Sequence, residues 1–167
     1  MNWILIAFYI VLGIFILWNI FGLLLPFLLL LWYLRSSRAC KTKEIVKLAK
    51  KLKKKDKEKT LKNVYKYMNK TYQGYPYHWN PIHLFDLRNF TVRDMLKRRL
   101  EKKKFLWCYS QVKLMKALLV ATKQFSHRDI KIRWTISHLY TPHQYLIVRV
   151  GKERYKVDPF YHKFKKI

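Results

Sequence analysis

The chain is poor in acidic residues and in cysteine. Only nine of its 167 residues are Asp or Glu, against 36 Lys and Arg, and the formal net charge is +27. The two cysteines, Cys40 and Cys108, are expected to be free thiols in a reducing cytoplasm. The histidines, among them His138, His143 and His162, form no HExxH or similar ligand pattern, so no metal site and no cofactor is expected.

Charge is also missing from the whole N-terminal part of the chain, from Trp3 to Leu34. A helix of that length reaches about 48 Å, which exceeds a hydrocarbon layer of roughly 30 Å. The segment lacks the basic start and the small-residue cleavage site of a signal peptide. We therefore expect residues 1–34 to form a transmembrane anchor.

Basic residues follow the apolar segment and none precedes it. The flank contains Arg35, Arg38, Lys41, Lys43 and Lys47. Such a bias predicts a single-pass protein with its N-terminus outside and its C-terminal domain in the cytoplasm. Cys40, in this flank, is either a palmitoylation site or an unmodified linker cysteine.

Residues 35–59 read as a basic juxtamembrane linker that contains an amphipathic helix. Ile45, Leu48, Ala49 and Leu52 have helical spacing, and lysines fill most other positions. This helix could lie on anionic lipid head groups or serve as a solvated spacer. The charge also suits nucleic acid, but no recognition motif accompanies it, so lipid is the favoured partner.

Residues 60–167 are expected to form one α+β domain. A helical stripe spans residues 61–72, an aromatic loop residues 75–90 and a basic helix residues 93–104. A further helix begins at Cys108 and runs to about Gln124, after which the pattern alternates as in antiparallel strands. The helix that begins at Cys108 should pack on that sheet.

Cys108 is the candidate nucleophile. A thiol at a helix N-terminus lies where the peptide dipoles favour the thiolate. Such a thiol needs an imidazole and a third group that orients the ring, and His143 and Asp158 are the candidates.

The spacing around Gly151-Lys152 supports this assignment. A two-residue type II′ turn there pairs Tyr145 with Asp158 and Leu146 with Val157. His143 and Asp158 then become diagonal neighbours on one sheet face, within reach of a hydrogen bond from Nδ1 of the ring. The same pairing sets Arg149 opposite Arg154, which is mildly destabilising.

Over roughly residues 60–160 the sequence resembles the transglutaminase-like superfamily of papain-like cysteine enzymes. The resemblance rests on the Cys-led segment WCYSQVKLMKALL, the strand DIKIRW and the run HQYLIVRVGKERYKVDPFY. It implies a papain-like fold in which Cys108 is the nucleophile, His143 the base and acid, and Asp158 the residue that orients the imidazole. Leu106, where glycine is frequent, and Gln144-Tyr145 after the histidine depart from the common pattern.

The expected function is that of a membrane-anchored cysteine enzyme that acts on protein or peptide amides through a thioester, by hydrolysis or acyl transfer. The alternatives are a catalytically inactive interaction module and a tethered binder of nucleic acid or anionic lipid. An oxyanion hole would use the Cys108 N–H and a second donor, for which Tyr77, His78 and Trp79 are candidates.

Overall fold

The computed structural model of the chain describes residues 3, 5–17, 42–75, 92–97, 105–137 and 141–167. The chain divides into two compact units, Met1–Arg38 and Ala39–Ile167. The second unit has the expected α+β composition, with the helices α2, α3, α4 and α5 and an antiparallel sheet of four strands.

The predicted transmembrane anchor is wrong. Within the described residues, no helix is both long enough and apolar enough to cross a membrane. Residues 5–17 are helical in the part of the chain that the structure describes. Residues 18–34 of the predicted anchor lie outside the described residues. The predicted single-pass topology, with the N-terminus outside and the domain in the cytoplasm, depended on this anchor and is wrong for the same reason.

The first helix of the second unit, α2 (Lys43–Leu52), buries the apolar stripe seen in the sequence. Thr42 caps the helix, because its Oγ1 accepts a hydrogen bond from the Ile45 N–H over 3.3 Å. The stripe of Ile45, Leu48, Ala49 and Leu52 belongs to the hydrophobic core, whereas most of the lysines are exposed. The apolar side of the predicted linker helix is therefore occupied within the domain.

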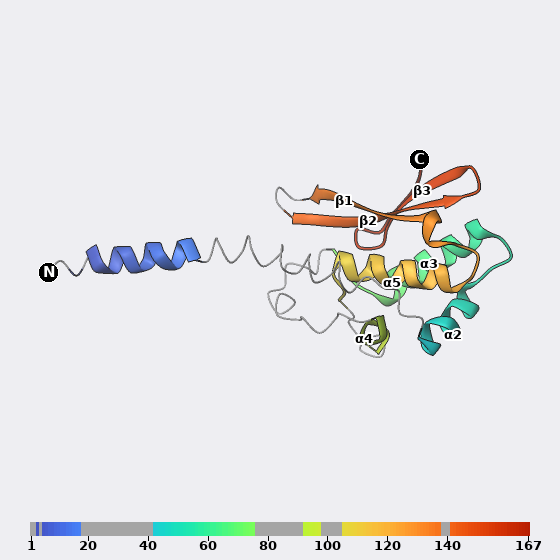
Figure 1. Cartoon of the computed structure of the whole chain (residues 1–167), viewed down its shortest axis with the longest axis horizontal. Coiled ribbons are helices and arrows are strands. Elements are labelled where there is room, and N and C mark those ends of the chain that lie inside the picture. The colour runs from blue at the N-terminus through green and yellow to red at the C-terminus, as the bar shows by residue number, and fades with distance from the viewer. Residues whose placement is uncertain (1–2, 4, 18–41, 76–91, 98–104, 138–140) are drawn as a thin grey trace. The chain divides into compact units, whose positions relative to one another are not determined.

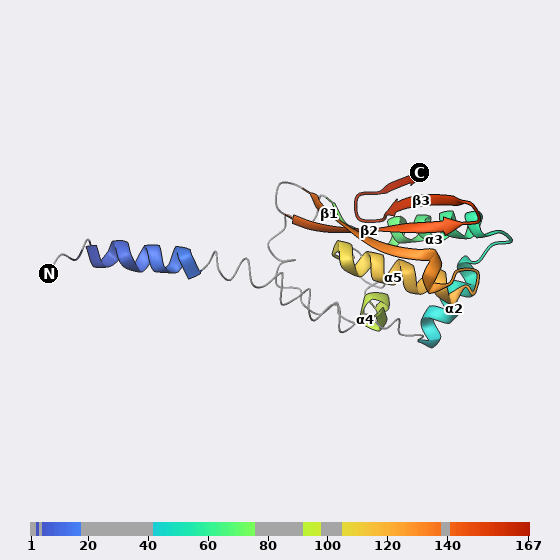
Figure 2. The same cartoon turned by 45° about the horizontal axis from the view of Figure 1, so that its top comes forward.

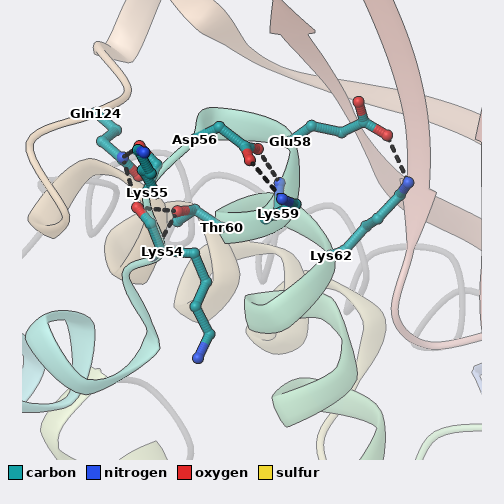
Figure 3. Close-up of polar contacts among 8 residues, drawn as sticks. All are labelled: Lys54, Lys55, Asp56, Glu58, Lys59, Thr60, Lys62 and Gln124. Carbon is teal, nitrogen blue, oxygen red and sulfur yellow. Dashed lines mark hydrogen bonds and ion pairs between the residues drawn. The ribbon is translucent and has the colours of Figure 1, made fainter.

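The connection between α2 and α3 (Lys57–Thr71) is fastened to the end of α5 by polar contacts, shown in Figure 3. The Gln124 side-chain amide donates to the Lys54 carbonyl over 2.9 Å, and Thr60 Oγ1 accepts from the Lys54 N–H over the same distance. Asp56 caps α3 by accepting from the Lys59 N–H over 2.7 Å. These contacts satisfy backbone groups that helix ends otherwise leave unpaired.

The central helix is α5 (Cys108–Ala121), which begins at the predicted residue. Its predicted stripe of Val112, Met115, Leu118 and Leu119 is fully buried. The short helix α4 (Val92–Lys97) covers the start of the predicted basic helix at residues 93–104, and the remainder of that helix lies outside the described residues. The same holds for residues 76–90 of the predicted aromatic loop.

The sheet has the order β1-β2-β3-β4, with β1 (Ile130–Ser137), β2 (Thr141–Val150), β3 (Glu153–Asp158) and β4 (Lys163–Lys166). The predicted register is confirmed, since Leu146 lies opposite Val157 and Arg149 opposite Arg154. Gly151 has a φ of 61°, and Lys152 is not among the non-glycine residues with positive φ, as a type II′ turn requires. The strand β4 was not predicted, because Phe164 is its single apolar residue.

The helices lie on one face of the sheet, with α5 and α3 next to the strands and α4 and α2 beyond them (Figure 1, Figure 2). The residues of β2 and β3 that face α5 are apolar and buried, namely Leu146, Val148, Tyr155 and Val157. Alternation along the strands sends the residues between them to the other face. The first turn of α5 lies next to the start of β2 (Figure 1), and His143 is the third residue of that strand.

Candidate active site

The Cys108 side chain lies at the N-terminus of α5 and is only partly buried. The residue before it, Trp107, is extended and gives no side-chain cap, and the first turn of the helix contains no acidic residue. The positive end of the helix dipole is therefore not compensated by a carboxylate of the helix itself.

His143 and Asp158 form a buried pair beside this thiol. The imidazole Nε2 lies 2.6 Å from the Asp158 Oδ2, and the two side chains are 4% and 5% exposed. The pair forms because β3 ends at Asp158 while β2 begins two residues before His143, as the two-residue turn requires. The structure thus brings together the two side chains that the sequence pattern placed on one sheet face.

The ring nitrogen in this bond differs from the prediction. The sequence argument assumed that Nδ1 would donate to the carboxylate, but the structure uses Nε2. With Nε2 committed to Asp158, Nδ1 is the nitrogen that remains for the thiol.

The imidazole also interacts with the Cys108 side chain, which acts with Asp158 on the pKa of the ring. Burial alone would lower the pKa of His143, because it disfavours the charged ring. Hydrogen bonds and charge interactions with Asp158 and Cys108 outweigh burial and raise this pKa from 6.5 to about 9. With this pKa the ring carries its second proton at neutral pH, between the Asp158 carboxylate and the Cys108 sulfur.

The second oxygen of Asp158 is held by the turn that follows β3. Its Oδ1 accepts a hydrogen bond from the Tyr161 N–H over 3.1 Å. The rings of Tyr161 and Phe160 pack around the imidazole, with centroids 4.6 Å and 5.7 Å from that of His143. The turn therefore orients the carboxylate and shields the pair from water.

One wall of the site depends on a glycine that the sequence argument did not single out. The Tyr75 N–H donates to the Phe160 carbonyl over 3.1 Å, which draws the end of the α3 segment against the turn after β3. A Cβ atom on Gly74 would lie 2.6 Å from that same carbonyl oxygen. Only glycine allows the two backbones to approach this closely.

Gln111, also missed by the sequence argument, fixes the approach to the nucleophile. Its side chain is fully buried in the first turns of α5, and Nε2 donates to the carbonyls of Gln73 and Leu106 over 3.0 Å each. The Leu106 N–H donates in turn to the Gln73 carbonyl over 3.1 Å. The available signal was a polar residue within an otherwise apolar helical stripe, which predicts a buried amide with specific partners.

The other residues considered in the sequence have a less direct relation to the site. Tyr77, His78 and Trp79, the candidates for a second oxyanion donor, lie outside the described residues, as do Cys40 and His138. His162 is exposed in the turn between β3 and β4. No group of three or more His, Cys, Asp or Glu side chains suited to a metal ion occurs in the described part of the chain.

Comparison of the chain with models of protein families, with curated proteins and with solved structures finds no match in any of the three. The resemblance to the transglutaminase-like superfamily therefore rests on the quoted motifs. The geometry of Cys108, His143 and Asp158 is an observation independent of that resemblance.

Proposed function

We propose that the protein is a transglutaminase-like cysteine enzyme that cleaves or exchanges protein or peptide amides through a thioester. The observation that carries the proposal is the buried, hydrogen-bonded pair of His143 and Asp158 beside Cys108, at the N-terminus of α5. In the proposed reactive form, the Cys108 thiolate is a strong nucleophile, and the neighbouring His143 imidazolium holds the proton that the leaving group needs.

In the first half of the reaction, Cys108 Sγ attacks the carbonyl carbon of an amide, either a glutamine side chain or a peptide bond. The carbonyl oxygen becomes an oxyanion, which the Cys108 N–H at the start of the helix is placed to stabilise. As the C–N bond breaks, His143 donates its proton to the departing nitrogen. Ammonia or an amine leaves, and the acyl group remains on sulfur.

In the second half, neutral His143 accepts a proton from water or from a primary amine that attacks the thioester. The C–S bond breaks, the acid or the new amide leaves, and the thiolate–imidazolium pair is restored. Asp158 keeps the ring in one orientation throughout and stabilises its positive charge. The cycle needs no further reagent, because each proton returns to its starting group.

The reactivity of the thiol gives the direct test. The full chain with Cys40→Ser carries Cys108 as its single thiol, and its alkylation by iodoacetamide would be followed from pH 5 to pH 10. We expect Cys108 to react at pH 6, and the His143→Ala change to slow this reaction about tenfold or more. His162→Ala is the matched control, because it removes an exposed imidazole of the same domain. A thiol that reacts only in alkaline solution, equally with and without His143, would contradict the proposal.

The chemistry itself is tested with a glutamine-rich acceptor protein, such as casein, and a dansylated primary amine. Incorporation of the amine reports acyl transfer, and release of ammonia without incorporation reports hydrolysis. Either activity should be lost in Cys108→Ala, and Asp158→Asn should reduce it by roughly a hundredfold or more, because the ring loses its orienting charge. Low-level labelling that survives Cys108→Ala would belong to a contaminant.

A further inference from the structure

The strand β1 combines an open edge with an exposed apolar surface beside the candidate site. It pairs with β2 alone in the described sheet, so alternate backbone N–H and C=O groups on its other side have no strand partner there. The β1–β2 ribbon extends past the end of β3, because Thr135 lies opposite His143 whereas the pairing of β3 with β2 begins at Leu146. This extension is visible in Figure 2. The open edge therefore borders the strand segment that carries the imidazole.

Side chains of opposite character alternate along β1. On the face shared with α5, the exposed fraction rises from 1% at Ile130 to 47% at Trp134 and 75% at Ile136. Lys131 and Arg133 point to the other face and are exposed. The ion pairs found among the described residues involve other cations, so neither of these two is neutralised by them.

We propose that the β1 edge binds an extended polypeptide segment of the substrate in which apolar and acidic residues alternate. A peptide added as a strand would pair with the open backbone groups. Its apolar side chains would meet Trp134 and Ile136, and the residues between them would face Lys131 and Arg133. The alternation of β1 thus specifies the alternation of its ligand.

This inference rests on the proposed function for its consequence, which is substrate selection. A strand added to β1 lies about 10 Å from β2, since each strand spacing is about 4.8 Å. Three extended residues cover that distance. The bound segment is therefore a recognition sequence, and the reacting amide lies a few residues beyond it.

A single-stranded nucleic acid suits the surface less well. Bases bind by stacking on exposed aromatic rings, but the exposed ring of Trp134 lies on the face of β1 opposite Lys131 and Arg133, the cations that would bind the phosphates. On the basic face of the sheet, the ring of Tyr145 is covered by the Lys156 ammonium, 4.3 Å from its centroid. The open backbone edge and the apolar pair at Trp134 and Ile136 both suit a peptide strand.

The test uses the full chain with Cys108→Ala, so that binding is measured apart from chemistry. The probe is a fluorescein-labelled peptide with the core Val-Glu-Leu-Glu-Val, compared by anisotropy with a peptide of the same composition in which the apolar and acidic residues are segregated. We expect the alternating peptide to bind at least about tenfold more tightly. Methylation of its backbone nitrogens should weaken binding at every second position, because only those N–H groups face β1.

Variants of the protein locate the surface. Ile136→Ser and Arg133→Glu should each weaken binding about tenfold, whereas Lys165→Glu, on the opposite edge strand β4, should change it less than about twofold. The inference would be overturned if the two peptides bound equally well, or if Lys165→Glu weakened binding as much as Arg133→Glu. It would also be overturned if oligothymidine displaced the alternating peptide from the protein with an unchanged β1. The binding test uses a protein without Cys108, so its outcome is independent of the alkylation test. Either the proposed function or the peptide-binding inference can therefore fail alone.

Discussion

At one end of the β2–β3 hairpin, His143 and Asp158 form a buried pair, whereas at the turn end Arg149 lies opposite Arg154 and pairs with Asp129 at the surface. The buried pair has a Cys108 thiol, a backbone N–H and two aromatic rings around it. The Arg149 side chain is 59% exposed and its bond to Asp129 measures 3.1 Å. We therefore expect loss of the buried pair to lower the stability of the domain strongly and loss of the surface pair to lower it little.

The largest effect should follow removal of the buried carboxylate. Asp158→Ala leaves the imidazole buried without its partner, and breaking a buried pair costs about 3 kcal/mol of unfolding free energy. Arg149→Met breaks the surface pair and should change stability by less than about 1 kcal/mol. Urea denaturation of both variants measures the two losses of unfolding free energy. Equal losses would contradict the expected difference between the buried and the surface pair.

Two glycines extend the comparison to the backbone. Gly74→Ala places a Cβ against the Phe160 carbonyl oxygen, so the backbones must move apart, at a cost of about 2 kcal/mol. Gly151→Ala meets no neighbouring atom but must adopt a φ of 61°, which costs about 1 kcal/mol. Thermal unfolding of the two variants should rank them in this order. The reverse order would show that the approach at Gly74 relaxes freely.

His143, at the active-site end of the hairpin, should make the stability of the domain depend on pH. Because the pKa of His143 is raised to about 9, its contribution is fully present below the unfolded value of 6.5 and is lost as the pH rises through about 9. The urea midpoint of the wild type should fall over this window by more than that of His143→Gln. If the urea midpoints of the two proteins changed equally with pH, the raised pKa of His143 would be contradicted.

The smallest effect should be a gain in stability at the turn end. Arg154→Glu replaces the like-charged pair with an opposite-charged one across the strands and should add about 0.5 kcal/mol. Arg154→Gln removes only the repulsion and should gain less. Because both residues are exposed, the gain should shrink in 1 M salt. A gain that persists in 1 M salt would have a cause other than charge.

The features that follow from local rules were predictable from the sequence. The positive φ of Gly151 and the alternation of Leu146 and Val148 specified the register of the hairpin, and the apolar stripe of α5 specified its buried face. The register in turn placed His143 beside Asp158. Two unpredicted features depend on approaches between distant segments, namely the contact of Gly74 with Phe160 and the amide bond of Gln111 to Gln73. The choice of Nε2 depends on the orientation of the ring, which the strand register does not determine. The transmembrane prediction used the length of the uncharged run and its basic flank, whereas no helix among the described residues is long and apolar enough to cross a membrane.

The bonds of Gln111 have a consequence for the order in which the site assembles. His143 and Asp158 are 15 residues apart in the chain, whereas Gln111 and Gln73 are 38 apart. Contacts between near neighbours close smaller loops and form sooner during folding. The hairpin can therefore complete the imidazole–carboxylate pair before the amide of Gln111 joins α5 to the α3 segment. During refolding of the complete chain, the acid–base half of the site would exist before its nucleophile is in place.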